Sequence, residues 1–545
     1  MKRYLQYLLE GGEQRVDYLL AYQVMEAEDR NYGGIAMRER AYPQAKSTIY
    51  RITPAICCYV NPASRFYKDS EVYDRIILAL KYIRSKQRES GCFDLENCNF
   101  DSAPDTAFCV KRLLPLYRIV ERYPAPNVEV IKEMLQEICK RALEGIADGG
   151  FHTPNHRWAI ASILADGSNL FNLPIHMEKA NEYLREGIDC NEYGEYSERS
   201  AITYNAVNNA AMITLFEATG EEKYLEYVRR NLTMMLTYFE DDGSIFSENS
   251  TRQDKGAKAF PRDYFYQYLY VAARDSDPMY GRAAKRIIDD NRRMNLRKAP
   301  DCLHYVMLDD PMQQYTFDGS GFLDSYERYY QSSGVMRFKS GKVSYSIVED
   351  SAKSLFFNTG SLGFFLRGSI GYFEKRHILF SDLTAVEGGY RTTFHGDGWY
   401  YLPFEQVDEE IVDFFAIDNT MRKKIIKNTV DIDIEVLHKD GGFDLVFTSR
   451  GIDEVSVFLE WVIPADCEVE NDAFYCISQP GGALLVRDGY VEVRSGMDRF
   501  SIGPMGVSKY IVKGNYGSEP ASESGFTLAT VMTTPFKKIF SVRSR

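Results

Sequence analysis

The hydrophobic periodicity changes once along this chain, and that change limits the folds open to it. Up to about residue 330, apolar residues recur three and four positions apart, as on helices with one buried face. From about Val343 the spacing becomes two, which is typical of β-strands. At 545 residues the chain is too long for a single core. We therefore predict two domains, residues 1–330 and 331–545.

The first domain is predicted to be a ring of helical hairpins. Helices are expected over residues 72–88, 128–144, 177–187, 205–219 and 222–239. Between helices, a glycine turn followed by an aromatic or aliphatic residue recurs about every 45–60 residues, at Gly91, Gly149–Gly150, Gly194 and Gly243. Hairpins that share a buried face stack into a solenoid or close into a ring. We expect the ring, an incomplete (α/α)6-type toroid, because it gathers these turns around one mouth.

The second domain is predicted to be an antiparallel β-sandwich, which makes the chain an α+β multidomain protein. Strands are expected over residues 343–348, 362–367, 429–437, 444–448, 455–462 and 490–494. None of them contains proline, and turn-rich stretches separate them. The small residues at 332–334 and 340–341 are expected to form a flexible join between the domains.

Composition excludes several classes of function. A net charge of −13 argues against nucleic acid as a partner, because phosphate binding needs a basic face. No segment approaches the 18 apolar residues of a membrane span. Residues 1–11 do not resemble a secretory signal, and the ten cysteines form no C-x-x-C pair, so free thiols in a cytoplasmic protein are the simplest expectation. The mature form of a secreted or periplasmic protein would look the same.

The stretch from Gly149 to Trp158 combines helix-start chemistry with ionisable groups. Thr153 is suited to the N-cap and Pro154 to the first helical position, so Asn155, His156 and Arg157 fall in the first turn. There the helix dipole favours a bound carboxylate and a neutral imidazole. The alternative is a capped helix whose polar residues only satisfy neighbouring backbone.

A second polar helix start follows about 45 residues later, at Glu195–Asn208. It offers Glu198, Arg199 and Tyr204 after the Gly194 turn. Ser200 and Tyr204 are four residues apart and would share a helix face. Arg199 converges on that face only if the helix begins near Ser200.

Together, Asn155-His156 and the later Arg199 and Tyr204 resemble the motifs of the α/α-toroid uronate lyases, which include the alginate lyases and the heparinase II/III-like group. The resemblance implies that Asn155 and Arg199 neutralise the uronate carboxylate, that His156 abstracts the C5 proton and that Tyr204 protonates the leaving oxygen. It also implies a helical toroid followed by a β-domain. The motifs span only about 55 residues, the Arg-to-Tyr spacing is shorter than in alginate lyases, and Arg157 is an additional charge.

The chemistry of such a reaction requires these residue types. Removing the proton next to a carboxylate builds an enolate-like dianion, which an amide and a guanidinium stabilise electrostatically. A base of near-neutral pKa and a phenol acid complete a β-elimination without a metal or another cofactor.

Further residues are candidates for binding the saccharide. Arg157, Arg252, Arg262 and Glu198 would lie at the toroid mouth, where arginine suits a sugar carboxylate. The alternative is that Arg252 and Arg262 form local ion pairs with Asp254 and Asp263. In the β-domain, His395 could reach the cleft and Trp399 could act as a sugar platform, or both could belong to a structural loop.

Two other functions remain open. A glycoside hydrolase on the same toroid, removing terminal glucuronic acid or unsaturated uronate, would use a carboxylate pair drawn from Glu195, Glu198, Asp254 and Asp263. A non-enzymatic saccharide-binding solenoid would explain the aromatic residues but not the Asn155-His156 pair with Arg199 and Tyr204. The expected partner is a uronate-containing saccharide, cleaved from the chain end if the enzyme is cytoplasmic, and a homo-oligomer is compatible with the sequence.

Overall fold

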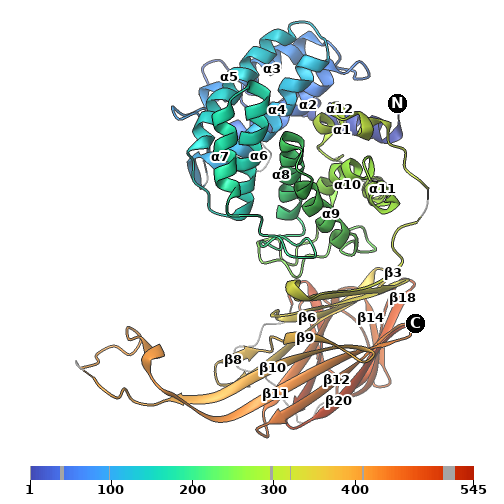
Figure 1. The fold of residues 1–545 in the computed structure, drawn as a ribbon. Helices are drawn as coiled ribbons and strands as arrows, with labels where there is room; N and C mark the ends of the chain where they lie inside the picture. Colours follow the sequence, from blue (N-terminus) through green and yellow to red (C-terminus); the bar gives the residue numbers. More distant parts are fainter. Residues whose placement is uncertain are drawn as a thin grey trace. The chain divides into compact units, whose positions relative to one another are not determined.

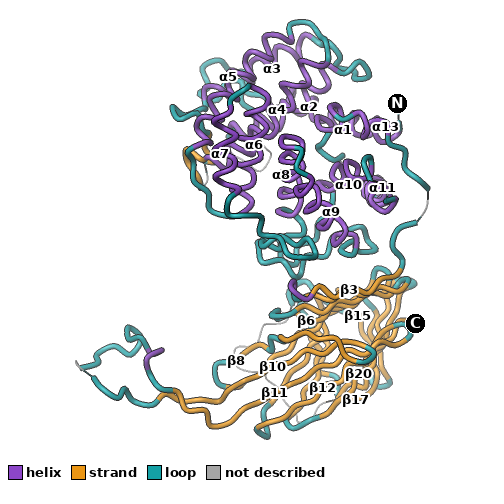
Figure 2. Tube along the Cα trace, in the orientation of Figure 1, coloured by secondary structure: helices purple, strands orange, loops and turns teal. Residues whose placement is uncertain are grey.

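A computed structural model gives the fold. It describes residues 2–36, 42–96, 98–275, 277–294, 299–319, 321–407, 410–506 and 522–545. The chain divides into two compact units, Met1–Phe322 and Leu323–Arg545. Figure 2 shows the first to be mainly helical and the second to be built from strands.

The first unit consists of helical hairpins (Figure 1). Its helices are α1 (Arg3–Tyr22), α2 (Ala45–Val60), α3 (Ser70–Ser85), α4 (Ala103–Arg122), α5 (Val128–Ala147), α6 (Pro154–Phe171), α7 (Pro174–Leu184), α8 (Tyr204–Thr219), α9 (Glu222–Leu236), η1 (Arg262–Tyr264), α10 (Phe265–Ala272), α11 (Pro278–Arg293), α12 (Leu303–Leu308) and α13 (Asp310–Gln314).

The helices form an inner and an outer layer. The even-numbered helices from α2 to α10 are the inner ones: all eight residues of α10 are buried, and α2 is buried on almost every side. The outer helices, such as α5 and α11, bury one face only. Since α2 packs on α4, α4 on α6 and α6 on α8, the inner helices follow one another around the unit. This arrangement confirms the predicted toroid.

The glycine turns between hairpins require glycine for steric reasons. Gly91 has φ +98° and Gly194 has φ +93°, a region that favours glycine. A Cβ atom on Gly91 would lie 1.9 Å from the carbonyl oxygen of Arg141, and one on Gly194 would lie 2.2 Å from the backbone nitrogen of Asn231. A small bridged turn follows Gly91, and another encloses Gly194. The first contains β1 (Phe93–Leu95) and β2 (Asn99–Ser102), which the sequence analysis missed.

The second unit is a sandwich of two large sheets. One sheet has the order β15-β14-β17-β18-β20-β12-β11-β10-β9, and the other the order β16-β19-β13-β7-β6-β5-β4-β3, with β8 paired to β7. Among the described strands of these sheets, the pairs are antiparallel except β16 with β19, which is parallel. The elements are β3 (Ser325–Tyr330), η2 (Gln331–Ser333), β4 (Val335–Ser340), β5 (Val343–Val348), β6 (Lys353–Thr359), β7 (Leu362–Tyr372), β8 (Lys375–His377), β9 (Ser381–Val386), β10 (Gly389–Tyr401), η3 (Asn419–Met421), β11 (Lys424–Lys439), β12 (Gly442–Gly451), β13 (Ser456–Pro464), β14 (Glu468–Asn471), β15 (Phe474–Ile477), β16 (Ala483–Leu485), β17 (Asp488–Ser495), β18 (Asp498–Gly506), β19 (Gly525–Thr533) and β20 (Lys537–Ser544).

Aromatic residues from the two sheets meet in the core of the sandwich. Phe357 of β6 contacts Phe500 of β18 at 5.5 Å between ring centroids, and Trp461 of β13 contacts Phe540 of β20 at 5.0 Å. These four side chains are fully buried. Such packing confirms the predicted antiparallel β-sandwich.

The flexible join expected at residues 332–341 is wrong: that segment holds η2, β4 and the β4–β5 turn, because β3 has already entered the sheet at Ser325. All ten cysteines are free thiols, as predicted, and seven are buried. Among the described residues, no helix is long and apolar enough to cross a membrane.

Candidate active site

Helix α6 begins where the sequence predicts. Thr153 occupies the N-cap with extended backbone, Pro154 is the first helical residue, and Asn155 and His156 lie in the first turn. The Thr153 hydroxyl does not cap the backbone, however. It accepts a hydrogen bond from the Asn155 side-chain amide, at 2.8 Å. The helix start therefore holds the Asn155 side chain in place.

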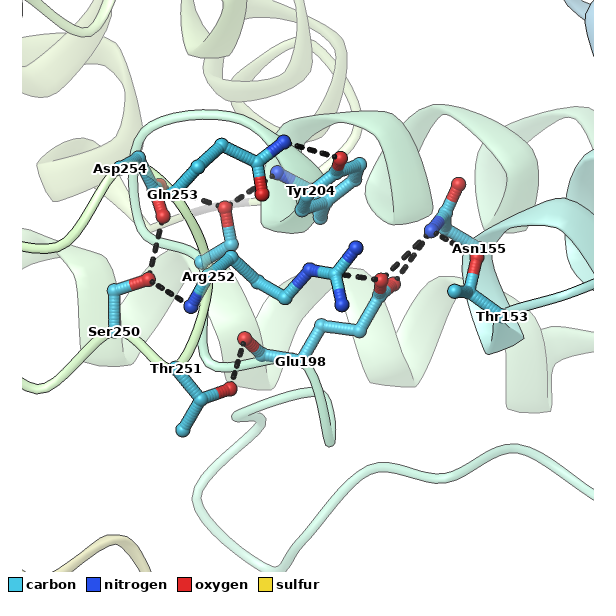
Figure 3. A network of polar contacts seen from close by, with 10 residues as sticks. Thr153, Asn155, Glu198, Tyr204, Ser250, Thr251, Arg252, Gln253 and Asp254 are labelled. Atoms are coloured by element: carbon cyan, nitrogen blue, oxygen red, sulfur yellow. Dashed lines mark hydrogen bonds and ion pairs between the residues drawn. The ribbon is translucent and has the colours of Figure 1, made fainter. Parts of the chain in front are cut away.

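The buried carboxylate of Glu198 faces this helix start (Figure 3). Asn155 Nδ2 donates to both Glu198 oxygens, at 2.8 and 2.9 Å. Arg252 Nε lies 3.9 Å from one of them. Burial raises the pKa of the Glu198 carboxyl, and Asn155 and Arg252 oppose the shift without cancelling it.

Arg252 connects Glu198 to Tyr204. Its guanidinium carbon lies 5.2 Å from the centroid of the Tyr204 ring, and Gln253 Nε2 donates to the Tyr204 hydroxyl at 3.0 Å. Tyr204 is the first residue of α8, and its backbone N–H donates to Ser200 Oγ. Asn155, Glu198, Arg252 and Tyr204 therefore form one continuous polar network (Figure 3).

His156 lies beside this network in a half-buried position. Its ring contacts Phe108 and His152 edge-on, with centroids 6.0 and 6.1 Å apart. Burial lowers the pKa of the His156 imidazole, and the positive charge of Arg252 adds to the shift. The ring is therefore neutral at pH 7, as a general base must be.

Three buried polar atoms of this cluster have no hydrogen-bond partner among the described residues. They are Asn155 Oδ1, His156 Nδ1 and Arg252 Nε. Buried polar atoms are normally paired, and the exceptions are frequent where polar ligands bind or react. Two of them, Asn155 Oδ1 and His156 Nδ1, are at the start of the same helix, which makes this the strongest candidate for a binding site.

An ion pair that the sequence does not predict lies next to His156. Lys46 of α2 donates to Asp105 of α4 at 3.0 Å, and both charges act on the imidazole. Asp105 also accepts from Asn99 and from Ser102, and Lys46 holds the pKa of the Asp105 carboxyl below its usual value against the effect of burial. One signal was present in the sequence: Ser102, Pro104 and Asp105 form a helix start like that of Thr153, Pro154 and Asn155.

Arg199 and Arg157 lie outside the network. Arg199 has a left-handed backbone, with φ +44°, and its Nε pairs with Glu195 at 3.7 Å. Helix α8 begins at Tyr204 rather than near Ser200, so the condition under which Arg199 would share the Tyr204 face is not met. Arg157 is buried, and its guanidinium binds Glu186, Asp189 and the Gly187 carbonyl.

Arg262 lines a separate cavity of about 670 Å³ in the helical unit. Its wall also includes Arg15, Arg51 and Asp263, as well as Thr203, which directly precedes Tyr204. The volume falls within the range of small-molecule sites. Cationic side chains outnumber acidic ones in the wall, which favours an anionic ligand.

Neighbouring groups already engage two of the carboxylates considered for hydrolysis. Glu195 accepts from Asn249 at 2.8 Å in addition to its ion pair with Arg199. Asp254 accepts from Ser200 Oγ at 2.7 Å and from the backbone N–H of Ile202 at 3.2 Å. The local pair Arg252–Asp254 is not observed, because Arg252 faces Glu198.

The two β-unit candidates lie on β10. His395 is held between Asp431 and Asp397, at 2.6 and 2.9 Å, and these carboxylates raise its pKa. The ammonium group of Lys424 lies 3.8 Å from the centroid of the Trp399 ring. Both side chains thus have partners within their own sheet.

The described part of the chain contains no group of three or more His, Cys, Asp and Glu side chains arranged to hold a metal ion.

Comparison with solved structures identifies the fold. A heparinase III aligns over 98% of this chain and 84% of its own, with a TM-score of 0.52 and 10% sequence identity. A chondroitinase AC lyase, solved in complexes with oligosaccharides, aligns over 99% of this chain and 82% of its own, with the same TM-score and identity. No protein-family model matches the sequence, and neither does any curated protein. The chain therefore shares the heparinase-like polysaccharide-lyase fold, a helical toroid followed in sequence by a β-sandwich.

Proposed function

We propose that this chain is a lyase that cleaves uronate-containing saccharides by β-elimination. The observation that carries the proposal is the network at the start of α6 and α8, in which Asn155, Arg252 and Tyr204 are connected beside a neutral His156. The shared fold adds support, since both solved structures are of polysaccharide lyases.

In the proposed reaction, the uronate carboxylate replaces Thr153 Oγ1 as the acceptor of one Asn155 N–H and binds a guanidinium. Both groups stabilise the charge that develops when C5 loses its proton. His156 takes that proton, the C4–O4 bond breaks, and a C4–C5 double bond forms. Tyr204 gives its phenolic proton to the leaving oxygen. His156 then carries the proton taken from C5, and proton exchange with solvent restores both groups.

We assign the guanidinium role to Arg252. The sequence resemblance favoured Arg199, but Arg252 is the arginine that pairs with Glu198 and lies over the Tyr204 ring. In this assignment Glu198 orients Asn155 and Arg252 and transfers no proton.

A hydrolase acting on terminal glucuronic acid or unsaturated uronate is the second candidate. The raised pKa of the buried Glu198 favours it, because a general acid must hold its proton near neutral pH. The three contacts from Asn155 and Arg252 favour the lyase, since they engage the carboxylate that a hydrolase would need free.

Product analysis over a panel of uronate oligosaccharides and aryl glucuronides separates the two candidates. A lyase product carries a C4–C5 double bond and absorbs in the ultraviolet, so we expect new absorbance. Release of free glucuronic acid without absorbance would refute the lyase.

Variants then test the residue roles. His156→Ala and Tyr204→Phe should each abolish the absorbance while leaving the thermal midpoint close to wild type. Arg252→Gln should be far more damaging than the matched Arg199→Gln. Full activity in either proton-transfer variant would overturn these roles. If Arg199→Gln loses more activity than Arg252→Gln, Arg199 is the residue that binds the substrate carboxylate.

A further inference from the structure

Strands β10 and β11 extend beyond the rest of their sheet. They pair with each other out to Tyr401 and Lys424. Their outer neighbours stop earlier: β9 pairs with β10 only as far as Thr393, and β12 pairs with β11 only from Val430. Figure 1 shows the resulting two-stranded arm, with the connecting loop at its end, projecting from the sheets of the β unit.

Near its base the arm is contacted by Tyr372, which donates to Asn428, and by Phe373, which packs on Tyr400. A two-stranded ribbon that continues beyond such contacts is only marginally stable in water. Its strands also present open hydrogen-bonding edges to solvent. The arm therefore gains stability from any surface that covers it.

The loop at the end of the arm exposes large apolar side chains. Phe415 is 92% exposed, Val412 is 91% exposed and Met421 is 76% exposed. Their exposed neighbours on the arm are Tyr400, Val407, Ile411, Phe414 and Ile426. Clusters of exposed apolar residues on a soluble protein mark interaction surfaces.

Charge on the arm is divided into two regions. All six acidic residues between 402 and 427 lie at or before Asp418, and all four basic residues lie at or after Arg422. The described charged residues of this segment are Glu405, Glu410, Asp413, Asp418, Arg422, Lys423, Lys424 and Lys427. Within the described ranges, no salt bridge links any of these eight to another residue of the chain. The acidic end and the basic stem each present uncompensated charge.

We propose that this arm binds the same arm of a second copy of the chain, antiparallel and about a two-fold axis. In that arrangement the acidic end of each arm lies against the basic stem of the other. The exposed apolar residues face each other between the two charged contacts. Such a self-complementary surface is what a two-fold dimer requires.

The charges also argue against other occupants. Lysines on an edge strand alone would discourage pairing, but the acidic end of the same arm supplies their complement. With six acidic residues against four basic ones, the arm does not suit an anionic membrane or nucleic acid. The inference does not depend on the proposed lyase activity.

Light scattering after size exclusion tests the proposal on the full chain. We expect a dimer at micromolar concentration and a monomer for the double variant Val412→Asp, Phe415→Asp. Met497→Asp is the matched control, because Met497 is 93% exposed on the β17–β18 turn, outside the arm. A thermal midpoint equal to wild type shows that each variant is folded.

Charge reversal tests the antiparallel geometry. The variant Glu410→Lys, Asp413→Lys and the variant Lys423→Glu, Lys424→Glu should each dimerise more weakly than wild type, because the substituted residues of each copy would then face like charges in the other. Mixing the two should restore stronger dimerisation, since the substituted lysines of one variant would face the substituted glutamates of the other. A wild-type monomer would overturn the proposal, as would a dimer that survives the Val412 and Phe415 changes. Failure of the mixture to associate would overturn the antiparallel arrangement.

Discussion

Replacing Glu198 with glutamine discriminates between its two candidate roles, because the expected losses differ in size. Gln keeps the shape of the side chain and one oxygen acceptor but removes the negative charge. A hydrogen bond to a charged acceptor contributes about 1.5–3 kcal/mol and a neutral one about 0.5–1.5 kcal/mol, so weakening the Asn155 contact costs about 1–1.5 kcal/mol. The Arg252 ion pair is 3.9 Å long and part-exposed, and adds at most about 1 kcal/mol.

In the lyase, the total of about 1–2.5 kcal/mol corresponds to a loss of roughly 5- to 70-fold in kcat/KM. In a hydrolase, Glu198 would transfer a proton, and losing that step costs a further factor of about 100 to 10,000. Initial rates on the best uronate oligosaccharide, read by absorbance and by released sugar, distinguish these ranges. Glu178→Gln, at an exposed position on α7, is the matched control.

The same variant makes a prediction about stability. Because the folded-state pKa of Glu198 is raised above its ordinary value of 4.5, the native protein loses stability as pH rises through that folded pKa. Gln carries no such charge. The thermal midpoint of Glu198→Gln minus that of wild type should therefore increase as the pH rises above 4.5. A loss in kcat/KM beyond about 1,000-fold would refute the positioning role, and a gap in midpoint that does not grow with pH would refute the account of burial.

Three further outcomes are expected. Burial lowers the pKa of His156, and neutral imidazole is the active form, so kcat/KM should rise with pH through a midpoint below 6.5. Arg252→Gln should move that midpoint upward, because it removes a positive charge. A wild-type midpoint above 6.5 would contradict the base role. Gly91→Ala, at φ +98° and with its Cβ against a carbonyl oxygen, should lower the free energy of unfolding by more than about 1 kcal/mol, whereas Gly319→Ala, in open space, should not change it in urea titrations. Arg157→Met should cost about 1–3 kcal/mol of stability and leave KM unchanged, because the guanidinium is bound within the fold. A raised KM would instead indicate that Arg157 binds the substrate.

Periodicity predicted those elements in which one face is buried. Residues 343–348 coincide with β5, and residues 205–219 differ from α8 by one residue. Periodicity did not predict elements whose buried residues follow no regular spacing. Helix α10 (FYQYLYVA) is buried all round and looks like an aromatic strand, and β3 (SYERYY) is too polar to be recognised as a strand.

In the candidate site, features set by neighbours in the chain can be predicted from the sequence, whereas contacts between distant residues cannot. The position of Asn155 and His156 follows from Thr153 and Pro154, which are their neighbours in the chain. The choice between Arg199 and Arg252 depends instead on a left-handed residue and on where α8 begins, and spacing along the chain specifies neither. Lys46 and Asp105 are 59 residues apart and meet only because α2 and α4 pack side by side. Packing of the toroid thus supplies the burial that lowers the pKa of His156 and the Asp105 and Lys46 charges that modify it, so the first turn of α6 alone does not determine the protonation of His156.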